Sequence, residues 1–277
     1  MAGLVKKFLA SASVVAGMSA VFGAPAMAAT FSPIGTDLIL REQVGNGFQE
    51  TDLSQLNSVL QGDSSNPGGN VEFGSSDTGG NPLAGVQAQN SQGTAKFTNV
   101  TEDIYNDVTW QQTVGLEWFS DAWAQTALAG STAMKSAAYG MFKSNGGFDL
   151  ISDPNISYIN AVGDDIVVGL AGHFNLADRF KDVHIGLANF LEGVQMSEIL
   201  AYDIDGVTGF AWSDSATATG LADNDAAGSF SGNYEVVIGG GGGILSEPPA
   251  DAPEPSTVLG IMAIGGLVAA TKRKSAK

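Results

Sequence analysis

Acidic residues stand at alternate positions in two places in the second half of the chain. Asp203 and Asp205 form one pair, and Asp223 and Asp225 form the other. Calcium loops present side-chain oxygens in this spacing. Neither pair completes an EF-hand, because the glycine at loop position six and the glutamate at position twelve are missing. The spacing allows weak calcium binding, but Asp205 followed by Gly206 is also typical of a tight hairpin turn.

The histidines are a second possible source of chemistry. The chain has only two, His173 and His184, and Asp178 and Asp182 lie between them. Together these four side chains could bind a metal ion. However, they do not have the close ligand spacing of a motif such as HExxH. We therefore expect His173 to lie at a strand end or turn, and we assign no metal or other cofactor to this stretch.

Two serine motifs resemble nucleophile motifs but have the wrong spacing. In GSTAMK, Lys135 follows Ser131 by four positions, whereas the S-x-x-K motif needs three. In GSFSG, residues 228–232, the central position is a phenylalanine, so the stretch is not the G-x-S-x-G elbow. We interpret the first as a helix cap and the second as a turn, and we predict no catalytic residue.

In the first third of the chain, hydrophobic periodicity predicts one strand and one helix. The strand covers residues 36–44, and the helix covers residues 51–61 with Thr51 as its N-cap. Residues 62–93 are rich in Gly, Ser and Asn, and only Val71–Phe73 within them is strand-like. This composition predicts a long surface loop.

The middle of the chain predicts two helices. The first covers residues 114–128, and the second covers residues 132–144, with Ser131 as its cap and Asn145-Gly146-Gly147 at its end. The short link between them predicts an antiparallel helical hairpin. Its aromatic side chains could stack on sugars, but at helical spacing a core role is more common; they are Trp118, Phe119, Trp123, Tyr139 and Phe142.

The last third predicts strands at residues 165–170 and 233–238, and a hairpin across residues 197–213. The fold class we predict is α+β, with a central helical hairpin and antiparallel strands mainly in the C-terminal half. One exported domain would cover residues 29–238. The glycine run at 239–243 lacks the Lys-Ser/Thr of a phosphate loop, so residues 239–252 predict a Gly/Pro-rich linker.

Both ends of the chain have the features of targeting segments. Residues 1–28 contain two lysines, an apolar stretch and a final Ala-Met-Ala, which predicts a signal peptide cleaved between Ala28 and Ala29. Near the other end, 13 apolar residues at 258–270 precede a basic cluster of Lys272, Arg273 and Lys274. A helix of that length spans about 20 Å, against a bilayer core of about 30 Å. The basic residues predict that the body faces away from the cytoplasm.

The body between these segments is strongly acidic. It carries 6 basic and 28 acidic residues once the six basic residues and one acidic residue of the terminal segments are set aside. Such a charge excludes nucleic-acid binding by phosphate neutralisation. The chain contains no cysteine, so its stability depends on a packed core rather than on disulfides.

The tail resembles a PEP-CTERM sorting signal, in which Pro253, Glu254 and Pro255 precede the apolar span and the basic cluster. The resemblance covers residues 253–277, which would form a sorting or anchor segment. It implies that exosortase, a membrane enzyme, processes the protein on its way to the surface or extracellular matrix of a Gram-negative or cyanobacterial cell. Residues 110–237 are similar to an uncharacterised family of cyanobacterial PEP-CTERM exoproteins, notably in SDPNISYIN, GLAGHFNLA and SGNYEV.

These observations predict an exported, non-enzymatic cell-surface or matrix protein. Its partners would be signal peptidase and exosortase during export, the membrane through the C-terminal segment, extracellular polysaccharide, and no nucleic acid. A carbohydrate- or calcium-binding adhesin module is the first alternative. A secreted hydrolase that uses His173 or His184 is the second.

Overall fold

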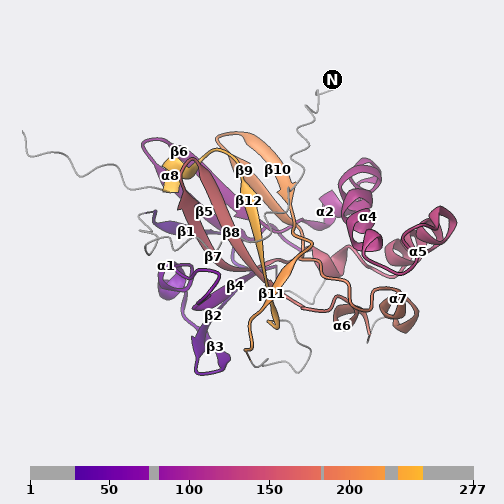
Figure 1. Ribbon diagram of the computed structural model, residues 1–277. Coiled ribbons are helices and arrows are strands. Elements are labelled where there is room, and N and C mark those ends of the chain that lie inside the picture. The colour runs from indigo at the N-terminus through magenta and orange to yellow at the C-terminus, as the bar shows by residue number, and fades with distance from the viewer. Residues whose placement is uncertain (1–28, 75–80, 182–183, 222–229, 246–277) are drawn as a thin grey trace, which may run out of the picture. The chain divides into compact units, whose positions relative to one another are not determined.

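The computed structural model describes residues 29–74, 81–181, 184–221 and 230–245 (Figure 1). These residues form two antiparallel β-sheets and a group of helices, as an α+β fold requires. The five-stranded sheet contains, in spatial order, β1 (Phe31–Ile34), β5 (Gly85–Asn90), β6 (Gly93–Thr98), β9 (Leu200–Ile204) and β10 (Val207–Ala211). The seven-stranded sheet contains β11 (Ala216–Ala218), β12 (Gly232–Ile238), β8 (Asp165–Gly172), β7 (Asn155–Val162), β4 (Gly69–Phe73), β2 (Leu38–Val44) and β3 (Gly47–Thr51).

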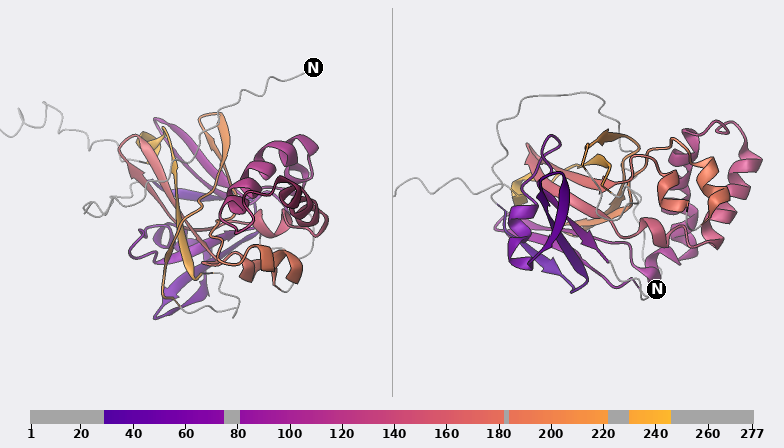
Figure 2. Two further views of the ribbon diagram at one scale, coloured as in Figure 1. Left: turned by 45° about the vertical axis from the view of Figure 1, so that its right-hand side comes forward. Right: turned by 90° about the horizontal axis from the view of Figure 1, so that it is seen from below.

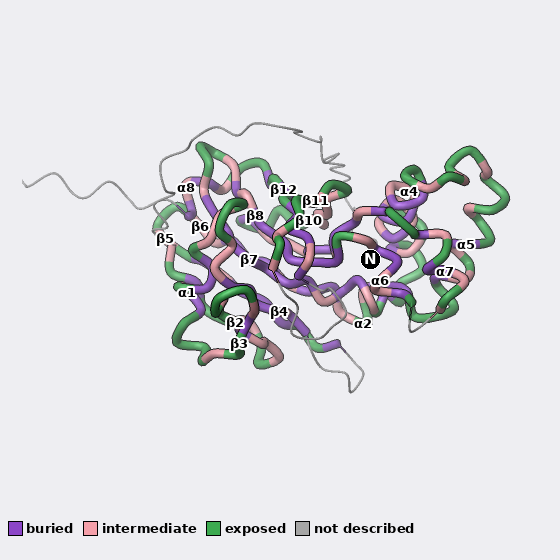
Figure 3. Tube along the Cα trace, turned by 60° about the horizontal axis from the view of Figure 1, so that its bottom comes forward, coloured by how far each residue is buried: buried purple, intermediate pink, exposed green. Residues whose placement is uncertain are grey.

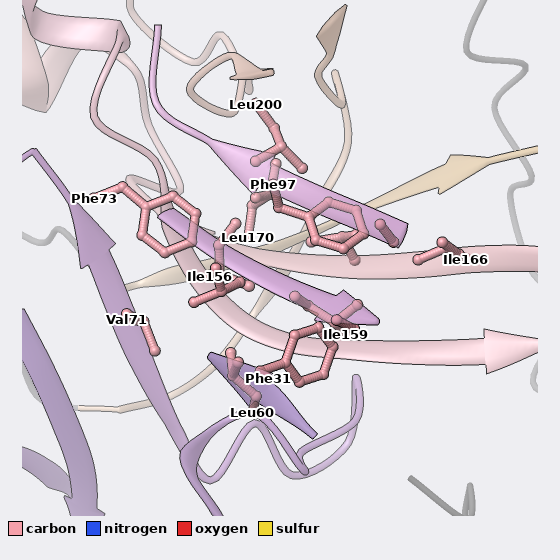
Figure 4. Close-up of a cluster of buried hydrophobic side chains, with 14 of the residues drawn as sticks. Phe31, Leu60, Val71, Phe73, Phe97, Ile156, Ile159, Ile166, Leu170 and Leu200 are labelled. Atoms are coloured by element: carbon pink, nitrogen blue, oxygen red, sulfur yellow. The ribbon is translucent and has the colours of Figure 1, made fainter. Parts of the chain in front are cut away.

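The main hydrophobic core is formed by side chains from both sheets. Val71 and Ile156 come from the seven-stranded sheet and Phe97 from the five-stranded sheet, and all three are fully buried. Figure 4 shows these side chains together with others of the same cluster. Strands such as β4, with Val71 and Phe73, and β12, with Tyr234, Val236 and Ile238, contribute alternate residues to this core, because successive side chains in a strand point to opposite faces.

A second core lies among the helices, which gather at one side of the sheets (Figures 1 and 2). Its centre is aromatic: Trp118, Phe119 and Phe142 are completely buried. The helical elements around it are α2 (Glu102–Tyr105), α3 (Val108–Trp110), the π-helical turn η2 (Gln111–Gly115), α4 (Leu116–Ala124), α5 (Thr132–Ser144), the 3-10 turn η3 (Asp149–Ile151), α6 (Ala177–Phe180) and α7 (Ile185–Phe190).

The two longest helices form where the sequence predicts them. Ser131 caps α5 by accepting a hydrogen bond from the Met134 amide, and Gly146 follows the helix with a φ of 70°. Glycine is favoured at such a stop, because other side chains are strained at positive φ. Phe119 of α4 and Phe142 of α5 pack with ring centroids 5.4 Å apart. The core role of the aromatic residues is therefore confirmed, while the antiparallel hairpin stays a prediction.

The predicted hairpin in the last third is formed by β9 and β10. Its two central residues, Asp205 and Gly206, have φ values of 50° and 83°. A type I′ turn needs positive φ at both positions, which explains the Asp-Gly pair. The predicted strands at 165–170 and 233–238 are β8 and β12.

The predicted distribution of strands is wrong. Of the twelve strands in the described residues, six, β1 to β6, lie before residue 99, so these strands are not concentrated in the C-terminal half. The predicted surface loop at 62–93 contains β4, whose Val71 and Phe73 are fully buried, and β5, which is paired on both sides. In β5 the buried Val86 and Ala88 alternate with the more exposed Gln87 and Gln89, as in a strand with one covered face.

Two predicted element boundaries also need correction. Thr51 belongs to β3, and Asp52 caps the 3-10 turn η1 (Leu53–Gln55) that leads into α1 (Leu56–Val59). The predicted helix at 51–61 is therefore a short turn of helix preceded by η1.

The predicted linker begins with a packed helical turn, α8 (Gly242–Leu245). Ile244 and Leu245 are each only 3% exposed and belong to the main core. The Gly242 amide donates to the Asp164 carbonyl at 2.9 Å. A Cβ at Gly242 would lie 2.3 Å from the Gly163 carbonyl oxygen, so the close approach requires glycine. The glycine run is therefore part of the fold up to Leu245.

Candidate functional site

A group of charged side chains lies where the helices meet the seven-stranded sheet. We call it the junction cluster and define it as Arg41 on β2, Glu72 on β4, Asp153 just before β7, Arg179 on α6 and Glu198 just before β9. The sequence between Ala29 and Ala252 contains only two arginines, and both belong to this cluster. Figure 3 shows that most residues of β4 and β7 are buried.

Backbone hydrogen bonds fix the two acidic residues that precede strands. On either side of Asp153, the Ser152 carbonyl accepts from the Val100 amide at 2.9 Å and the Pro154 carbonyl accepts from the Phe73 amide at 3.2 Å. Next to Glu198, the Ser197 carbonyl accepts from the Trp118 indole nitrogen at 2.9 Å. The backbone around Asp153 is therefore fixed by β4 and by the segment after β6, and the backbone beside Glu198 is fixed by α4.

Arg179 joins three separate segments. Its Nε donates to the Leu150 carbonyl at 2.9 Å, and its Nη2 lies 3.4 Å from both carboxylate oxygens of Asp153. The same Nη2 is 3.8 Å from Oε1 of Glu198. Arg179, Asp153 and Glu198 retain 27%, 19% and 12% of their side-chain exposure. One guanidinium is thus shared by two carboxyl groups that are largely removed from water.

Arg41 and Glu72 form the other ion pair of the cluster. Nη1 of Arg41 is 2.5 Å from Oε2 of Glu72, on the adjacent strand of the same sheet. In the strand register, Glu72 stands directly opposite Asn155 of β7. The backbone amide of Asn155 in turn donates to the carboxyl group of Glu198. These contacts connect the two ion pairs into one polar band.

Burial strongly perturbs the two acids that share Arg179. Burial raises the pKa of Asp153 to about 7; the positive charge of Arg179 opposes the rise, and the negative charge of Glu72 adds to it. Burial also raises the pKa of Glu198 well above its usual range, assisted by the charge of Asp153 and opposed by Arg179. Both acids therefore hold their protons to a higher pH than solvated carboxyl groups do.

A carboxyl group that is still protonated at neutral pH has two well-known uses. It can donate a proton in general acid catalysis, or it can be a structural member of an ion-pair network. Metal binding has no support in the described parts of the chain, which contain no group of three or more His, Asp or Glu side chains suited to hold an ion.

The first predicted calcium pair belongs to the hairpin turn. Asp203 Oδ1 accepts from the Gly206 amide at 2.8 Å, and its Oδ2 pairs with Lys96 Nζ at 3.1 Å. Asp205 Oδ1 accepts from the Thr94 amide at 2.7 Å. Both carboxylates therefore take part in protein contacts. The second pair, Asp223 and Asp225, lies outside the described residues.

The two histidines have different structural roles and do not form one site. His184 is the N-cap of α7, where its Nδ1 accepts from the Leu187 amide at 3.0 Å. His173 is buried directly after β8, and its carbonyl accepts from the Tyr234 hydroxyl at 2.6 Å. Asp178 lies 3.9 Å from Lys181 Nζ, and Asp182 lies outside the described residues.

The serine motifs have structural roles in the described residues. Ser131 is the helix cap of α5, as predicted. In the 228–232 stretch, Ser231 Oγ accepts from the Phe174 amide at 3.0 Å immediately before β12 begins.

The junction cluster was not among the sites predicted from the sequence. Its acids and arginines are separated by up to 157 positions, from Arg41 to Glu198, so no local motif unites them. A signal did exist: Glu198 directly precedes the apolar residues Ile199, Leu200 and Ala201, and a charged residue that becomes buried is usually paired. The scarcity of arginine in the body was a second signal.

The targeting residues lie outside the described residues, except Ala29, which packs against the main core. The predicted cleavage site between Ala28 and Ala29 therefore stays a prediction. No helix in the described ranges has the length and apolar character needed to cross a membrane.

Comparison with known proteins adds one finding, at the C-terminal end. A family model described as the PEP-CTERM protein-sorting motif matches residues 251–274. This range contains Pro253, Glu254, Pro255 and the basic cluster at 272–274. Neither the curated proteins nor the solved structures yield a match, so the similarity to a cyanobacterial family stays a prediction. The chain carries a PEP-CTERM sorting motif, which marks an exported protein that is processed by exosortase and attached at the cell surface.

Proposed function

We propose that this protein is a non-enzymatic component of the cell surface or extracellular matrix, delivered there through its tail. The observation that carries the proposal is the PEP-CTERM motif at residues 251–274. The α+β body would be the cargo that the tail delivers.

The positions of the reactive side chains support a non-enzymatic role. Ser131 and His184 cap helices, and Asp203 closes a hairpin turn. Nucleophilic catalysis needs a nucleophile and a base within hydrogen-bonding reach, and these residues make other contacts.

The charge of the body supports a place among hydrated polymers. With 28 acidic and 6 basic residues, it repels other copies of itself and remains soluble. Hydroxyl-rich polysaccharide is the matrix partner that this surface suits, because it brings no high density of negative charge.

A secreted hydrolase is the second candidate, and the junction cluster is the observation that favours it. Asp153 and Glu198 approach the same guanidinium nitrogen, and an acid protonated at neutral pH can serve as a general acid. If the protein is a hydrolase, it should turn over a glycosidic or ester substrate. The variant Glu198→Gln should then lose this turnover while it retains the fold.

The experiment for the leading proposal is the intact mass of the protein from separated inner-membrane, outer-envelope, matrix and medium fractions. We expect a product that starts near Ala29, ends near Pro253 and lies outside the inner membrane. Extra mass would indicate glycosylation and a matrix role. A product that retains Lys272–Lys277 in the inner membrane would overturn sorting and would make the tail a simple anchor.

Variants make the test specific for the motif. The double substitution Pro253→Ala and Pro255→Ala should leave the tail uncut and the protein in the inner membrane. The matched control is Pro248→Ala with Pro249→Ala, two prolines that precede the matched range. If the control protein stays in the inner membrane to the same extent as the motif variant, the loss of prolines in general, and not the loss of the motif, explains the retention.

A further inference from the structure

The seven-stranded sheet has a second face, which points away from the main core. Val71 of β4, Ile156 of β7 and Tyr234 of β12 belong to the main core, so the residues next to them in each strand point to the other face. An asparagine occupies one such position in each of these strands; they are Asn70, Asn155 and Asn233. The three are only 0%, 7% and 3% exposed, whereas asparagine is mostly exposed in folded proteins. At these positions the second face is therefore both buried and polar.

Several polar atoms on this face have no partner. Nδ2 and Oδ1 of Asn70 have no hydrogen-bond partner in the described parts of the chain, and neither has Oδ1 of Asn155 or of Asn233. Glu198 accepts from the Asn155 amide, and its Oε2 also lacks a partner there. Folded proteins pair about nine in ten buried polar groups, either with protein or with ordered water. Such a concentration of unpaired atoms on one sheet face points to a group that binds there.

The strand register places these atoms near one another. Arg41 stands directly opposite Asn70, and Glu72 stands directly opposite Asn155. Asn70 and Asn155 are therefore diagonal neighbours on adjacent strands, with Cα atoms about 7–8 Å apart. Arg41 and Glu72 keep 17% and 21% of their side-chain exposure. The unpaired atoms thus adjoin side chains that reach water, and a ligand can approach from that side.

The unpaired atoms also define the chemistry of the ligand. The unpaired oxygens of Asn155, Asn233 and Glu198 accept hydrogen bonds, so the ligand must bring donors. Asn70 offers a donor and an acceptor in one plane, which suits two neighbouring hydroxyl groups: one accepts from Nδ2 and the other donates to Oδ1. An ionised carboxylate brings only acceptors, and the acidic body repels it. These properties favour an uncharged ligand with several hydroxyl groups.

An apolar wall lies beside the unpaired atoms. Phe48 and Phe230 pack with ring centroids 4.7 Å apart and form a small cluster with Ala171. Ala171 stands between Asn155 and Asn233 in the strand register. Ligand sites combine such apolar walls with a few polar groups that fix the orientation of the ligand. A sugar ring suits both surfaces, because it has C–H faces and a rim of hydroxyl groups.

We propose that the second face of the seven-stranded sheet binds a unit of a neutral polysaccharide through the side chains of Asn70, Asn155 and Glu198. Asn233 and the Phe48–Phe230 pair lie at the edge of this site. The bound sugar supplies the hydrogen bonds that the free protein lacks. Unpaired polar atoms destabilise a fold, and a binding role explains why they are retained. The inference rests on the proposed matrix role and names the chemistry of the partner in the matrix.

Binding of neutral disaccharides to the full exported chain tests the proposal. The probes are maltose, cellobiose, lactose and mannobiose, with digalacturonate as the acidic comparison, and saturation-transfer NMR at pH 7 detects the bound sugar. We expect saturable binding of at least one neutral disaccharide and weaker or no binding of digalacturonate. Binding of no neutral disaccharide, or binding of digalacturonate as strongly as any neutral one, would overturn the proposal. Sorting is measured separately, by the mass of the protein in each cell fraction, so either idea can fail alone.

Variants separate a binding role from a structural one. Asn70→Leu should weaken sugar binding by about tenfold or more, because it removes a paired donor and acceptor. Its unfolding midpoint should equal or exceed that of the wild type, because leucine is similar in size and leaves no polar atom unpaired. Asn155→Leu is a second variant that should weaken sugar binding. Asp203→Asn should bind as the wild type does, because its carboxylate belongs to the hairpin turn.

Asn99→Leu is the matched control for stability. Asn99 is also 0% exposed, but its Oδ1 accepts from the Ala84 amide at 3.0 Å and its Nδ2 donates to the Pro82 carbonyl at 2.8 Å. Its replacement should lower the unfolding midpoint, because it breaks these bonds. If Asn70→Leu lowers the midpoint as much as Asn99→Leu does, ordered water or protein already pairs Asn70 and the proposal fails. Unchanged sugar binding in folded Asn70→Leu or Asn155→Leu would refute it as well.

Discussion

Two pairs of carboxyl groups in this protein differ in how far apart their residues lie in the sequence. Asp203 and Asp205 are neighbours along the chain, and a spacing rule finds them at once. Asp153 and Glu198 are 45 positions apart, and only folding brings both to Arg179. The first pair serves its own turn, and Asp203 still has 30% of its side-chain exposure. The second pair lies between layers and has strongly raised pKa values.

The difference shows that local spacing and chemical perturbation are separate properties. Carboxylates that are close in sequence can stay close to water, and water screens their charges. Asp153 and Glu198 meet through tertiary contacts at a site from which water is largely excluded. There the loss of hydration is the largest cause of their raised pKa values. Four predictions test this contrast, beginning with the largest expected effect.

Arg179→Met should destabilise the protein most. It leaves Asp153 and Glu198 without their shared cation and removes the hydrogen bond to the Leu150 carbonyl. Breaking a buried ion pair typically costs 3–5 kcal/mol, and because these side chains keep some exposure we expect about 2–3 kcal/mol of unfolding free energy. Denaturant unfolding at pH 7 measures it. Arg179→Lys keeps the charge and should lose less; equal losses would show that charge is not what matters.

Glu198→Gln should become increasingly more stable than the wild type as the pH rises. The folded-state pKa of Glu198 is raised, so the unfolded chain releases its proton first and wild-type stability is lost with increasing pH. We expect the two proteins to have similar unfolding free energies at pH 4.5 and the variant to be the more stable of the two at pH 7.5. Denaturant unfolding across this range checks the sign. A difference that shrinks as the pH rises would contradict the burial of this acid.

Asp205→Ala should have a moderate effect. It removes the hydrogen bond from the Thr94 amide and places alanine at a φ of 50°. Both changes together should cost about 1–2 kcal/mol. Asp205→Asn is the matched control, because asparagine tolerates this backbone conformation, and it should cost less than 1 kcal/mol. Thermal unfolding of both variants would distinguish turn geometry from charge.

Asp203→Asn should have the smallest effect. Its partner Lys96 keeps 42% of its side-chain exposure, and exposed ion pairs contribute about 0–1 kcal/mol. The same variant tests calcium binding at this turn. Any rise in melting temperature that calcium gives the wild type should persist in Asp203→Asn. Loss of a calcium-dependent rise in this variant would restore the turn as a calcium site.

The fold was predictable where the information is local. The Asp205-Gly206 turn, the α5 helix with its Ser131 cap, and the apolar strand β8 each follow from a short stretch of sequence. Strands β5 and β6 were not predictable in this way. Their small and polar residues lack a strong alternating pattern, and they are strands because β1 and β9 pair with their outer edges. From composition alone, the glycines of α8 predict a linker. Their role in the fold depends on the packing of α8 against the main core, which a local pattern does not contain.

The sequence by itself determined the destination of this protein and much of its local structure. A sorting motif is a linear signal in the sequence, and turns and caps depend on residues within a few positions of each other. Only the tertiary structure decided the junction cluster. Raised carboxyl pKa values require exclusion of water, and at this site segments from five places in the chain together exclude it.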